Sequence, residues 1–311
     1  MNKTTILIAG IGGVGGYFGG LLAKQFHASK TIAIHFLARG EHLKEIQTKG
    51  LTVLKGDETW TSRPALASDK PGELGPADVV IICTKSYDLE EMLQQLKPCI
   101  HNDTLLLPLL NGVSATEQIR KAYPENSVAD GCVYLVSRLK QAGVIENSGN
   151  IQTLYFGGSH PADEKFKMLE NLFRQSGIEA TLSQDISMVI WEKFIFLSPT
   201  ATATSYFDTC IGELLASEEG LSTITALIGE VTQLAKAKHI TVADDMIQKT
   251  MAKLRALPFS ATSSMHSDFQ AHKAHTELES LTAYVIRESQ ALQLETPMYL
   301  AAYTALKKRA S

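Results

Sequence analysis

The sequence lacks the features that mark membrane, disulfide-stabilised and nucleic-acid-binding proteins. No apolar run in the 311 residues reaches about 18 residues, the length that a membrane-spanning helix needs. The four cysteines lie far apart without a CxxC pair, which favours free thiols in a reducing compartment. A net charge of -4 gives no broad basic surface, so nucleic acid is not an expected partner.

Signals for export, metal binding and hydrolysis are missing as well. The opening residues, MNKTTILIAG, have neither the long apolar segment nor the cleavage site of a signal peptide. No GxSxG or HExxH motif occurs. His266, His272 and His275 lack metal-ligand spacing and are interpreted as solvated residues or residues at the edge of a site. We therefore expect a cytoplasmic protein with no metal centre and no membrane partner.

The apolar periodicity changes near residue 183. Before this point, apolar runs alternate with helical patterns, as in a doubly wound parallel sheet; the runs are 5–9, 31–37, 78–84 and 105–110. Further strands are expected at 128–137, 150–156 and 178–182, and a helix at 162–175. Later spacing is helical, at 188–197, 222–238, 243–254, 277–292 and 297–308, with a loop at 259–267. The sequence thus predicts an α/β fold: a Rossmann domain over 1–182 and an all-α domain over 183–311.

A glycine-rich segment directly follows the first predicted strand and opens the first predicted helix. It reads GIGGVG from residue 10 to 15 and fits the GxGxxG pattern of dinucleotide-binding proteins. The first glycine permits a tight turn, the second lets the backbone approach a diphosphate, and the third lets the helix pack closely on the strand. We expect the cofactor to bind on Gly10, Gly12, Gly13, Val14 and Gly15.

Arg39 follows the end of the second predicted strand, where an NAD-binding domain usually carries an acidic side chain for the ribose 2′-hydroxyl. A guanidinium can instead pair with the 2′-phosphate of NADP through two hydrogen bonds. Arg39 as an exposed surface residue and Glu41 as the ribose acceptor are the open alternatives. The sequence favours NADPH.

Several motifs, in one order along nearly the whole chain, resemble the ketopantoate reductase (2-dehydropantoate 2-reductase) family. They are the GxGxxG segment, LARG at 37–40, CTKSYD at 83–88, LLNGV at 109–113, WEKF at 191–194, SSM at 263–265 and TE at 276–277. The resemblance implies a two-domain enzyme that uses NADPH to reduce the ketone of 2-dehydropantoate to pantoate, a step toward coenzyme A. A homodimer is expected by analogy with similar helical domains.

Lys193 matches the lysine that this family uses as a general acid at the carbonyl oxygen. Hydride delivery to a ketone develops negative charge on oxygen, which an ammonium group stabilises and protonates. The alternative is a lysine whose stem packs along an amphipathic helix. Glu277 matches the glutamate that binds the substrate hydroxyl, but Thr276 and Glu279 have capping-box spacing, so an ordinary acidic residue at a helix start is the alternative.

Three further residues match family positions near cofactor and substrate. Asn111 matches an asparagine beside the nicotinamide and substrate, and Lys85 a lysine near both; each follows a predicted strand, where Rossmann proteins bind ligands. Ser264 matches a serine that hydrogen-bonds the substrate carboxylate. Turn-forming roles are the alternatives for Asn111 and Ser264.

The segment after Lys193 departs from the family pattern. Family members often carry asparagines there, whereas this chain has Leu197 and Ala201, with hydroxyl side chains at 198, 200 and 202 as candidate replacements. Losing amide donors can change specificity by orders of magnitude. Two alternative functions follow: NADPH-dependent reduction of a different 2-oxo acid, and a non-catalytic redox sensor that binds NADPH.

Overall fold

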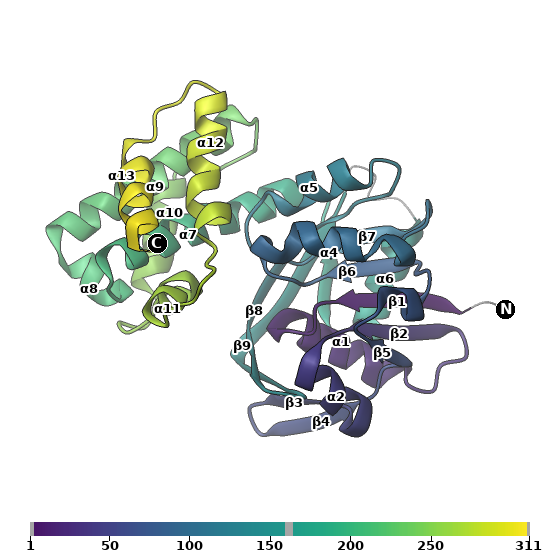
Figure 1. The fold of residues 1–311 in the computed structure, drawn as a ribbon. Helices are drawn as coiled ribbons and strands as arrows, with labels where there is room; N and C mark the ends of the chain where they lie inside the picture. The colour runs from purple at the N-terminus through teal and green to yellow at the C-terminus, as the bar shows by residue number, and fades with distance from the viewer. Residues whose placement is uncertain (1–2, 159–163, 310–311) are drawn as a thin grey trace. The chain divides into compact units, whose positions relative to one another are not determined.

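A computed structural model describes residues 3–158 and 164–309. The chain divides into two compact units (Figure 1). The first comprises Met1–Asn111 and Ala115–Ile186, and the second comprises Gly112–Ser114 and Ser187–Ser311.

The first unit is built on a parallel sheet with the strand order β5-β2-β1-β6-β7. Its strands are β1 (Thr4–Ala9), β2 (Ile32–Leu37), β5 (Leu66–Ser68), β6 (Val79–Ile82) and β7 (Leu105–Pro108). Neighbouring strands pair in parallel, and β6 and β7 are buried at every residue, as strands covered on both faces must be. The predicted doubly wound sheet is confirmed.

Helices cover both faces of this sheet, because successive side chains along each strand point to opposite faces. Ile6 and Ile8 pack with residues of α1 and α6, whereas Leu7 packs with residues of α4 and α5. The helices are α1 (Gly13–Phe26), α2 (Gly40–Lys49), α3 (Pro71–Leu74), α4 (Leu89–Gln95), α5 (Ala115–Ala122) and α6 (Glu164–Gln175), with 3-10 turns η1 (Ser86–Asp88) and η2 (Lys97–Cys99). The first two residues of the helix predicted at 162–175 lie outside the described residues.

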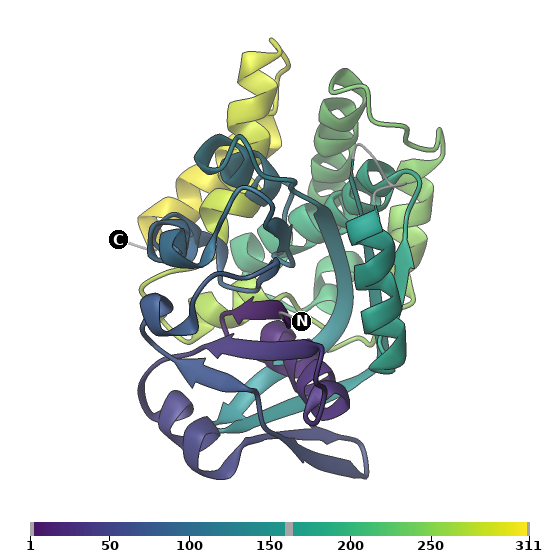
Figure 2. The same cartoon turned by 90° about the vertical axis from the view of Figure 1, so that its right-hand side faces the viewer.

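The later strands of the first unit form a separate mixed sheet. They are β8 (Asp130–Gln141), β9 (Val144–Gly157) and β10 (Glu179–Leu182), joined by β3 (Leu51–Lys55) and β4 (Glu58–Ser62), which sequence reasoning missed. The order is β10-β9-β3-β4, with β8 antiparallel to β9. Figure 2 shows the β8 and β9 ribbons, in teal, passing beside α1, in purple. Gly16 and Gly20 let α1 pack closely on Ile145 and Val53 of this sheet.

The second unit is helical throughout its described residues. Its elements are α7 (Ile186–Phe207), α8 (Ile211–Ala216), α9 (Glu218–Ala237), α10 (Met246–Arg255), α11 (Ser264–Gln270), the π-helix η3 (Glu279–Ala283), α12 (Tyr284–Ala291) and α13 (Pro297–Arg309). The predicted helical character is confirmed, but α7 continues past 197 through Pro199. The loop prediction at 259–267 is wrong from Ser264 onward, because Ser263 caps a helix there by accepting the His266 N–H (3.0 Å). No helix in the described ranges combines the length and apolarity needed to cross a membrane.

Candidate functional site

The carboxyl ends of β1 and β6 lie side by side at the point where the strand order reverses. Open α/β sheets bind ligands at such points. Gly10 follows β1 with a φ of 96°, a left-handed conformation that favours glycine. Its N–H donates to the Leu37 carbonyl (3.2 Å), and the Cys83 N–H after β6 donates to the Ala9 carbonyl (2.8 Å). These bonds fix the turn from β1 into α1 beside the loop that follows β6.

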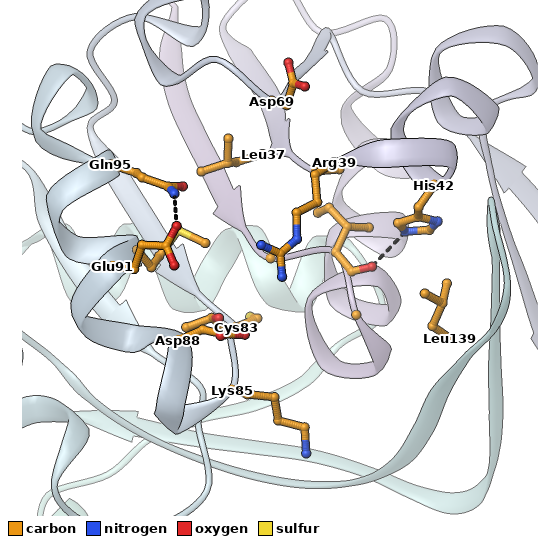
Figure 3. A pocket seen from close by; sticks show the side chains of 16 residues that line it. Leu37, Arg39, His42, Asp69, Cys83, Lys85, Asp88, Glu91, Gln95 and Leu139 are labelled. Atoms are coloured by element: carbon orange, nitrogen blue, oxygen red, sulfur yellow. Dashed lines mark hydrogen bonds between the residues drawn. The ribbon is translucent and has the colours of Figure 1, made fainter. Parts of the chain in front are cut away.

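A pocket of about 430 Å³ opens at these strand ends (Figure 3). Its volume falls in the range of about 300–1,000 Å³ that is typical of small-molecule sites. Of the predicted cofactor residues, Gly10, Gly12, Arg39 and Lys85 line it. The pocket also has polar lining residues that sequence reasoning did not single out: His42, Asp69, Asp88, Glu91 and Gln95.

The start of α1 fits the diphosphate of a dinucleotide. Gly12 is the N-cap residue, no side chain caps the first turn, and no acidic residue stands in it. The first-turn N–H groups have no partners within the helix, and the helix dipole favours an anion there. A Cβ on Gly12 would meet no atom within 4 Å, so the backbone is open to a ligand.

Two other glycines of the segment are needed for packing. A Cβ on Gly13 would lie 2.2 Å from the Ser137 carbonyl oxygen of β8, and one on Gly15 would lie 2.1 Å from the Gly10 carbonyl oxygen. Gly13, Val14 and Gly15 do not line the pocket. Their predicted contacts with the cofactor stay predictions.

Arg39 extends into the pocket from the N-cap position of α2 (Figure 3). Within residues 3–158 and 164–309, its guanidinium forms no hydrogen bond or ion pair. An unpaired cation in a pocket is suited to bind an anionic group. Arg39 is therefore available to a phosphate.

Glu41 was the alternative acceptor for the ribose, but the acidic residue that lines the pocket after the neighbouring strand β5 is Asp69. Glu41 does not line the pocket, and its carboxylate pairs with Lys44 (2.6 Å). Asp69 directly follows β5, and the Ala38 N–H donates to the Ser68 carbonyl (3.2 Å). Arg39 directly follows Ala38, and Asp69 directly follows Ser68. The hydrogen bond between Ala38 and Ser68 therefore places Arg39 and Asp69 at neighbouring strand ends.

Lys85 and Asn111 follow neighbouring strands. Lys85 precedes η1 after β6, is exposed and lines the pocket. Asn111 follows β7, is half-buried and does not line the pocket, and Gly112 beside it has a φ of 91°, as a turn requires. Of these two residues, Lys85 lines this pocket and Asn111 does not.

Lys193 lies on α7 in the second unit and is half-buried. Trp191 and Phe194 beside it are buried in the core of this unit, while Phe196 and Leu197 are partly exposed. The lysine therefore projects from an apolar helix, and apolar side chains stand three and four residues after it.

Glu277 is buried, with 2% of its surface exposed, which is rare for a carboxylate. The predicted capping box is wrong. Thr276 Oγ1 accepts the Leu278 N–H (3.4 Å), but the Glu279 carboxylate turns to α13, where it binds Lys307 Nζ (2.6 Å). Glu277 is therefore not a solvent-exposed acidic residue at the start of a helix.

Ser264 begins α11, and its side chain is exposed. Its hydroxyl forms no hydrogen bond with the residues that the structure describes. The interpretation of His266 as solvated is wrong, because its ring is buried between Thr262 Oγ1 (2.6 Å) and Asp208 Oδ1 (2.9 Å). The hydrogen bond from His266 and the charge of Arg309 lower the pKa of the Asp208 carboxyl.

The hydroxyl side chains after Lys193 are used inside the second unit. Ser198 Oγ donates to the Leu281 carbonyl (2.9 Å) and pairs with Tyr299 Oη (2.7 Å). Thr202 pairs with Thr282 (2.8 Å). Both side chains are fully buried, and Thr200 donates to its own helix at the Phe196 carbonyl (2.6 Å). They are therefore occupied as structural hydrogen-bond partners and do not replace the missing asparagines.

No group of three or more His, Cys, Asp or Glu side chains among the described residues is arranged to hold a metal ion. The cysteines in the described ranges, Cys83, Cys99, Cys132 and Cys210, form no disulfide bond.

Comparisons with known proteins cover both units. The model of the ketopantoate reductase PanE/ApbA family matches residues 6–160, and that of its C-terminal part matches residues 185–310. The solved structure of 2-dehydropantoate 2-reductase from Porphyromonas gingivalis W83 is 35% identical, with a TM-score of 0.86 over 98% of this chain and 100% of that chain.

One further relative and one structure of similar fold also span nearly the whole chain. The uncharacterized oxidoreductase YkpB of Bacillus subtilis (strain 168) is 29% identical over 302 residues, 97% of each protein. The structure of D-mandelate dehydrogenase with NADH and anilino(oxo)acetate is 21% identical, with a TM-score of 0.83 over 99% of this chain and 98% of that chain. The family models and the relative at 35% identity together establish that this chain belongs to the ketopantoate reductase family of oxidoreductases.

Proposed function

We propose that this chain catalyses the NADPH-dependent reduction of 2-dehydropantoate to pantoate. The observation that carries the choice of cofactor is Arg39, an unpaired guanidinium in the pocket beside the glycine segment, among the residues described. A 2′-phosphate, present in NADPH and absent from NADH, is the group that such a cation distinguishes.

In this proposal the first turn of α1 binds the diphosphate, Arg39 binds the 2′-phosphate, and Lys85 lies near the phosphates and the nicotinamide. When bound, the cofactor supplies a hydride to the ketone carbon of the substrate. The pocket residues bind and orient it, which lowers the entropy cost of the reaction.

The remaining proposed residues act on the substrate. Lys193 Nζ donates a hydrogen bond to the ketone oxygen and then transfers a proton to it as negative charge develops. The Asn111 amide donates to the same oxygen. Ser264 Oγ donates to the carboxylate of the substrate, and Glu277 accepts from its hydroxyl.

The proposal is tested by measuring turnover with 2-dehydropantoate, monitored as the loss of NADPH absorbance. We expect Lys193→Ala to lower kcat by about 100-fold or more with an unchanged Kd for NADPH. Lys249→Ala is the matched control, because Lys249 is an exposed lysine of the same unit that pairs with Asp245. Equal turnover by Lys193→Ala and wild type excludes Lys193 as the acid.

Arg39→Ala tests the choice of cofactor separately. We expect NADPH to bind about 10- to 100-fold more weakly, the loss of one charge-assisted contact, while NADH binding changes little. An equal effect on both cofactors contradicts the assignment of the 2′-phosphate to Arg39.

A different 2-oxo acid is the second candidate substrate. It is favoured by the partly exposed Leu197 and by the internal hydrogen bonds of Ser198 and Thr202, which leave this part of α7 with few free donors. The structure of D-mandelate dehydrogenase, which has a similar fold, contains anilino(oxo)acetate. If phenylglyoxylate or 2-oxoisovalerate gives a higher kcat/KM than 2-dehydropantoate, this alternative replaces the first.

A non-catalytic NADPH sensor is the third candidate, and it predicts binding without turnover of any 2-oxo acid. For the assembly we propose a homodimer, by analogy with other helical second domains. Sedimentation analysis of the purified chain tests this point.

A further inference from the structure

His42 joins three parts of the first unit that are far apart in sequence. It lies on α2, three residues after Arg39, and lines the pocket. Its Nε2 lies 2.8 Å from the Ile11 carbonyl oxygen of the glycine segment, the contact drawn as a dashed line in Figure 3. Its Nδ1 lies 2.8 Å from the backbone nitrogen of Gly143, in the turn between β8 and β9.

These two contacts fix the protonation state of the ring. The Gly143 N–H can only donate, so Nδ1 must accept. The Ile11 carbonyl can only accept, so Nε2 must carry the hydrogen. Only the neutral Nε2–H form of imidazole satisfies both bonds.

The Ile11 carbonyl belongs to the same peptide group as the Gly12 N–H. A trans peptide group is planar, and its C=O and N–H point in opposite directions. The bond from His42 therefore turns the Gly12 N–H away from α2. His42 is the hydrogen-bond partner that the described structure gives to the Ile11 carbonyl.

We infer that His42 is a positioning residue for the dinucleotide: its neutral ring holds the Ile11–Gly12 peptide in the orientation that binds the diphosphate. This inference rests on the proposed use of a dinucleotide and adds a residue to it. The β8–β9 turn has its own support, because the Thr52 N–H donates to the Gly143 carbonyl (2.9 Å). Replacing His42 thus releases the glycine segment without detaching the turn.

Among the described residues, the charged groups around His42 form no ion pair with its ring, and burial favours its neutral form. On α2, Glu41 pairs with Lys44 and Glu45 with Lys49; on the hairpin, Arg138 and Lys140 both pair with Glu146. The positive Arg39 lines the same pocket, as do Lys85, Asp69, Asp88 and Glu91, and no ion pair in the described ranges includes His42. Burial lowers the pKa of His42, partly opposed by its bond to Ile11.

Protonation of His42 places a second N–H on Nδ1, facing the Gly143 N–H. Because the pKa of His42 is lowered, the neutral form that holds the peptide persists to a pH below the ordinary value and is lost only as the pH falls further. NADPH affinity is therefore expected to fall as the pH drops through the lowered pKa of His42, which lies below the ordinary value of about 6.5.

The test is the Kd of the full-length protein for NADPH, measured by fluorescence titration between about pH 5 and 8. We expect His42→Leu to raise the Kd about tenfold at neutral pH, since it leaves the Ile11 carbonyl without its donor. His42→Gln keeps a side-chain N–H donor, so it restores most of this affinity and removes the acid-dependent loss seen in the wild type. Protonation of the 2′-phosphate of NADPH affects binding to the wild type and to the variants alike, so it does not change the comparison of their Kd values.

His35→Gln is the matched control. His35 is equally half-buried, burial also lowers its pKa, and its Nδ1–H donates to the Leu74 carbonyl (3.1 Å) away from the glycine segment. Its variant should bind NADPH as the wild type does. Equal affinities of His42→Leu and wild type, or the same acid dependence in His42→Gln and wild type, overturn the role of His42. A wild type that binds neither NADPH nor NADH overturns the proposed function as well.

Discussion

Three glycines at the start of α1 are predicted to respond differently to the same added methyl group: its N-cap residue Gly12, and Gly13 and Gly15 in its first turn. Gly12 lines the pocket, and its added Cβ meets no atom within 4 Å. The added Cβ of Gly13 lies 2.2 Å from the Ser137 carbonyl oxygen, and that of Gly15 lies 2.1 Å from the Gly10 carbonyl oxygen. Substitution by alanine therefore separates the glycine needed for ligand approach from those needed for packing.

The expected magnitudes follow from these contacts. At Gly13 and Gly15 the obstructing atoms belong to the backbone, so a strand or turn must shift, at a cost of about 1–3 kcal/mol or more. The better helix propensity of alanine offsets at most about 1 kcal/mol. A net loss of about 2 kcal/mol lowers the Tm of a unit of this size by about 4–8 °C.

Gly12→Ala should behave in the opposite way. The φ of Gly12 is -87°, which alanine adopts without strain. We expect its stability to stay within about 0.5 kcal/mol of the wild type. Its NADPH affinity should fall about tenfold or more, because the methyl group occupies space that the diphosphate approaches.

Scanning calorimetry and NADPH titration on the three variants provide the assay. Gly12→Ala is the folding control for the other two, and they are its controls for binding. A Tm for Gly12→Ala that falls as far as that of Gly15→Ala refutes the reasoning. So does a wild-type Tm for both Gly13→Ala and Gly15→Ala.

Three further predictions concern charge, buried hydrogen bonds and pH. Asp69→Asn should raise the affinity for NADPH relative to NADH about three- to tenfold, since it removes a negative charge beside the proposed 2′-phosphate site; an unchanged ratio of the two Kd values contradicts this placement. Ser198→Ala should cost about 1–3 kcal/mol in urea unfolding because the buried Tyr299 hydroxyl loses its partner, and a loss within experimental error opposes the prediction. His35 has a lowered pKa, so its contribution is present above about pH 6.5 and lost as the pH falls; His35→Gln should flatten the acid side of the stability profile, and an unchanged slope rules this out.

Local sequence determined much of the first unit. The turn from β1 into α1 depends on glycines that are neighbours in the chain, and the position of Arg39 depends on where one apolar run ends. Such features are readable because φ preferences and apolar periodicity act over a few residues. The helical character of the second unit was readable for the same reason.

Contacts between distant residues were decided only by the tertiary structure. β3, β4 and β5 are short, so their apolar pattern is weak, and without β5 the position of Asp69 beside Arg39 could not be predicted. Pro199 marks a helix end in sequence, yet α7 continues through it in the packed unit.

The hydrogen bond that the Gly143 N–H donates to His42 joins residues 101 positions apart, and Ser198 pairs with Tyr299 across the same separation of 101. Residue type and spacing along the chain cannot assign these partners, because their pairing depends on how sheets and helices pack. The sequence by itself determined a dinucleotide-binding turn and the order of the elements. The tertiary structure decided which polar groups stay free to bind a ligand and which are used within the fold, since a buried polar group must find its hydrogen-bond partner wherever packing provides one.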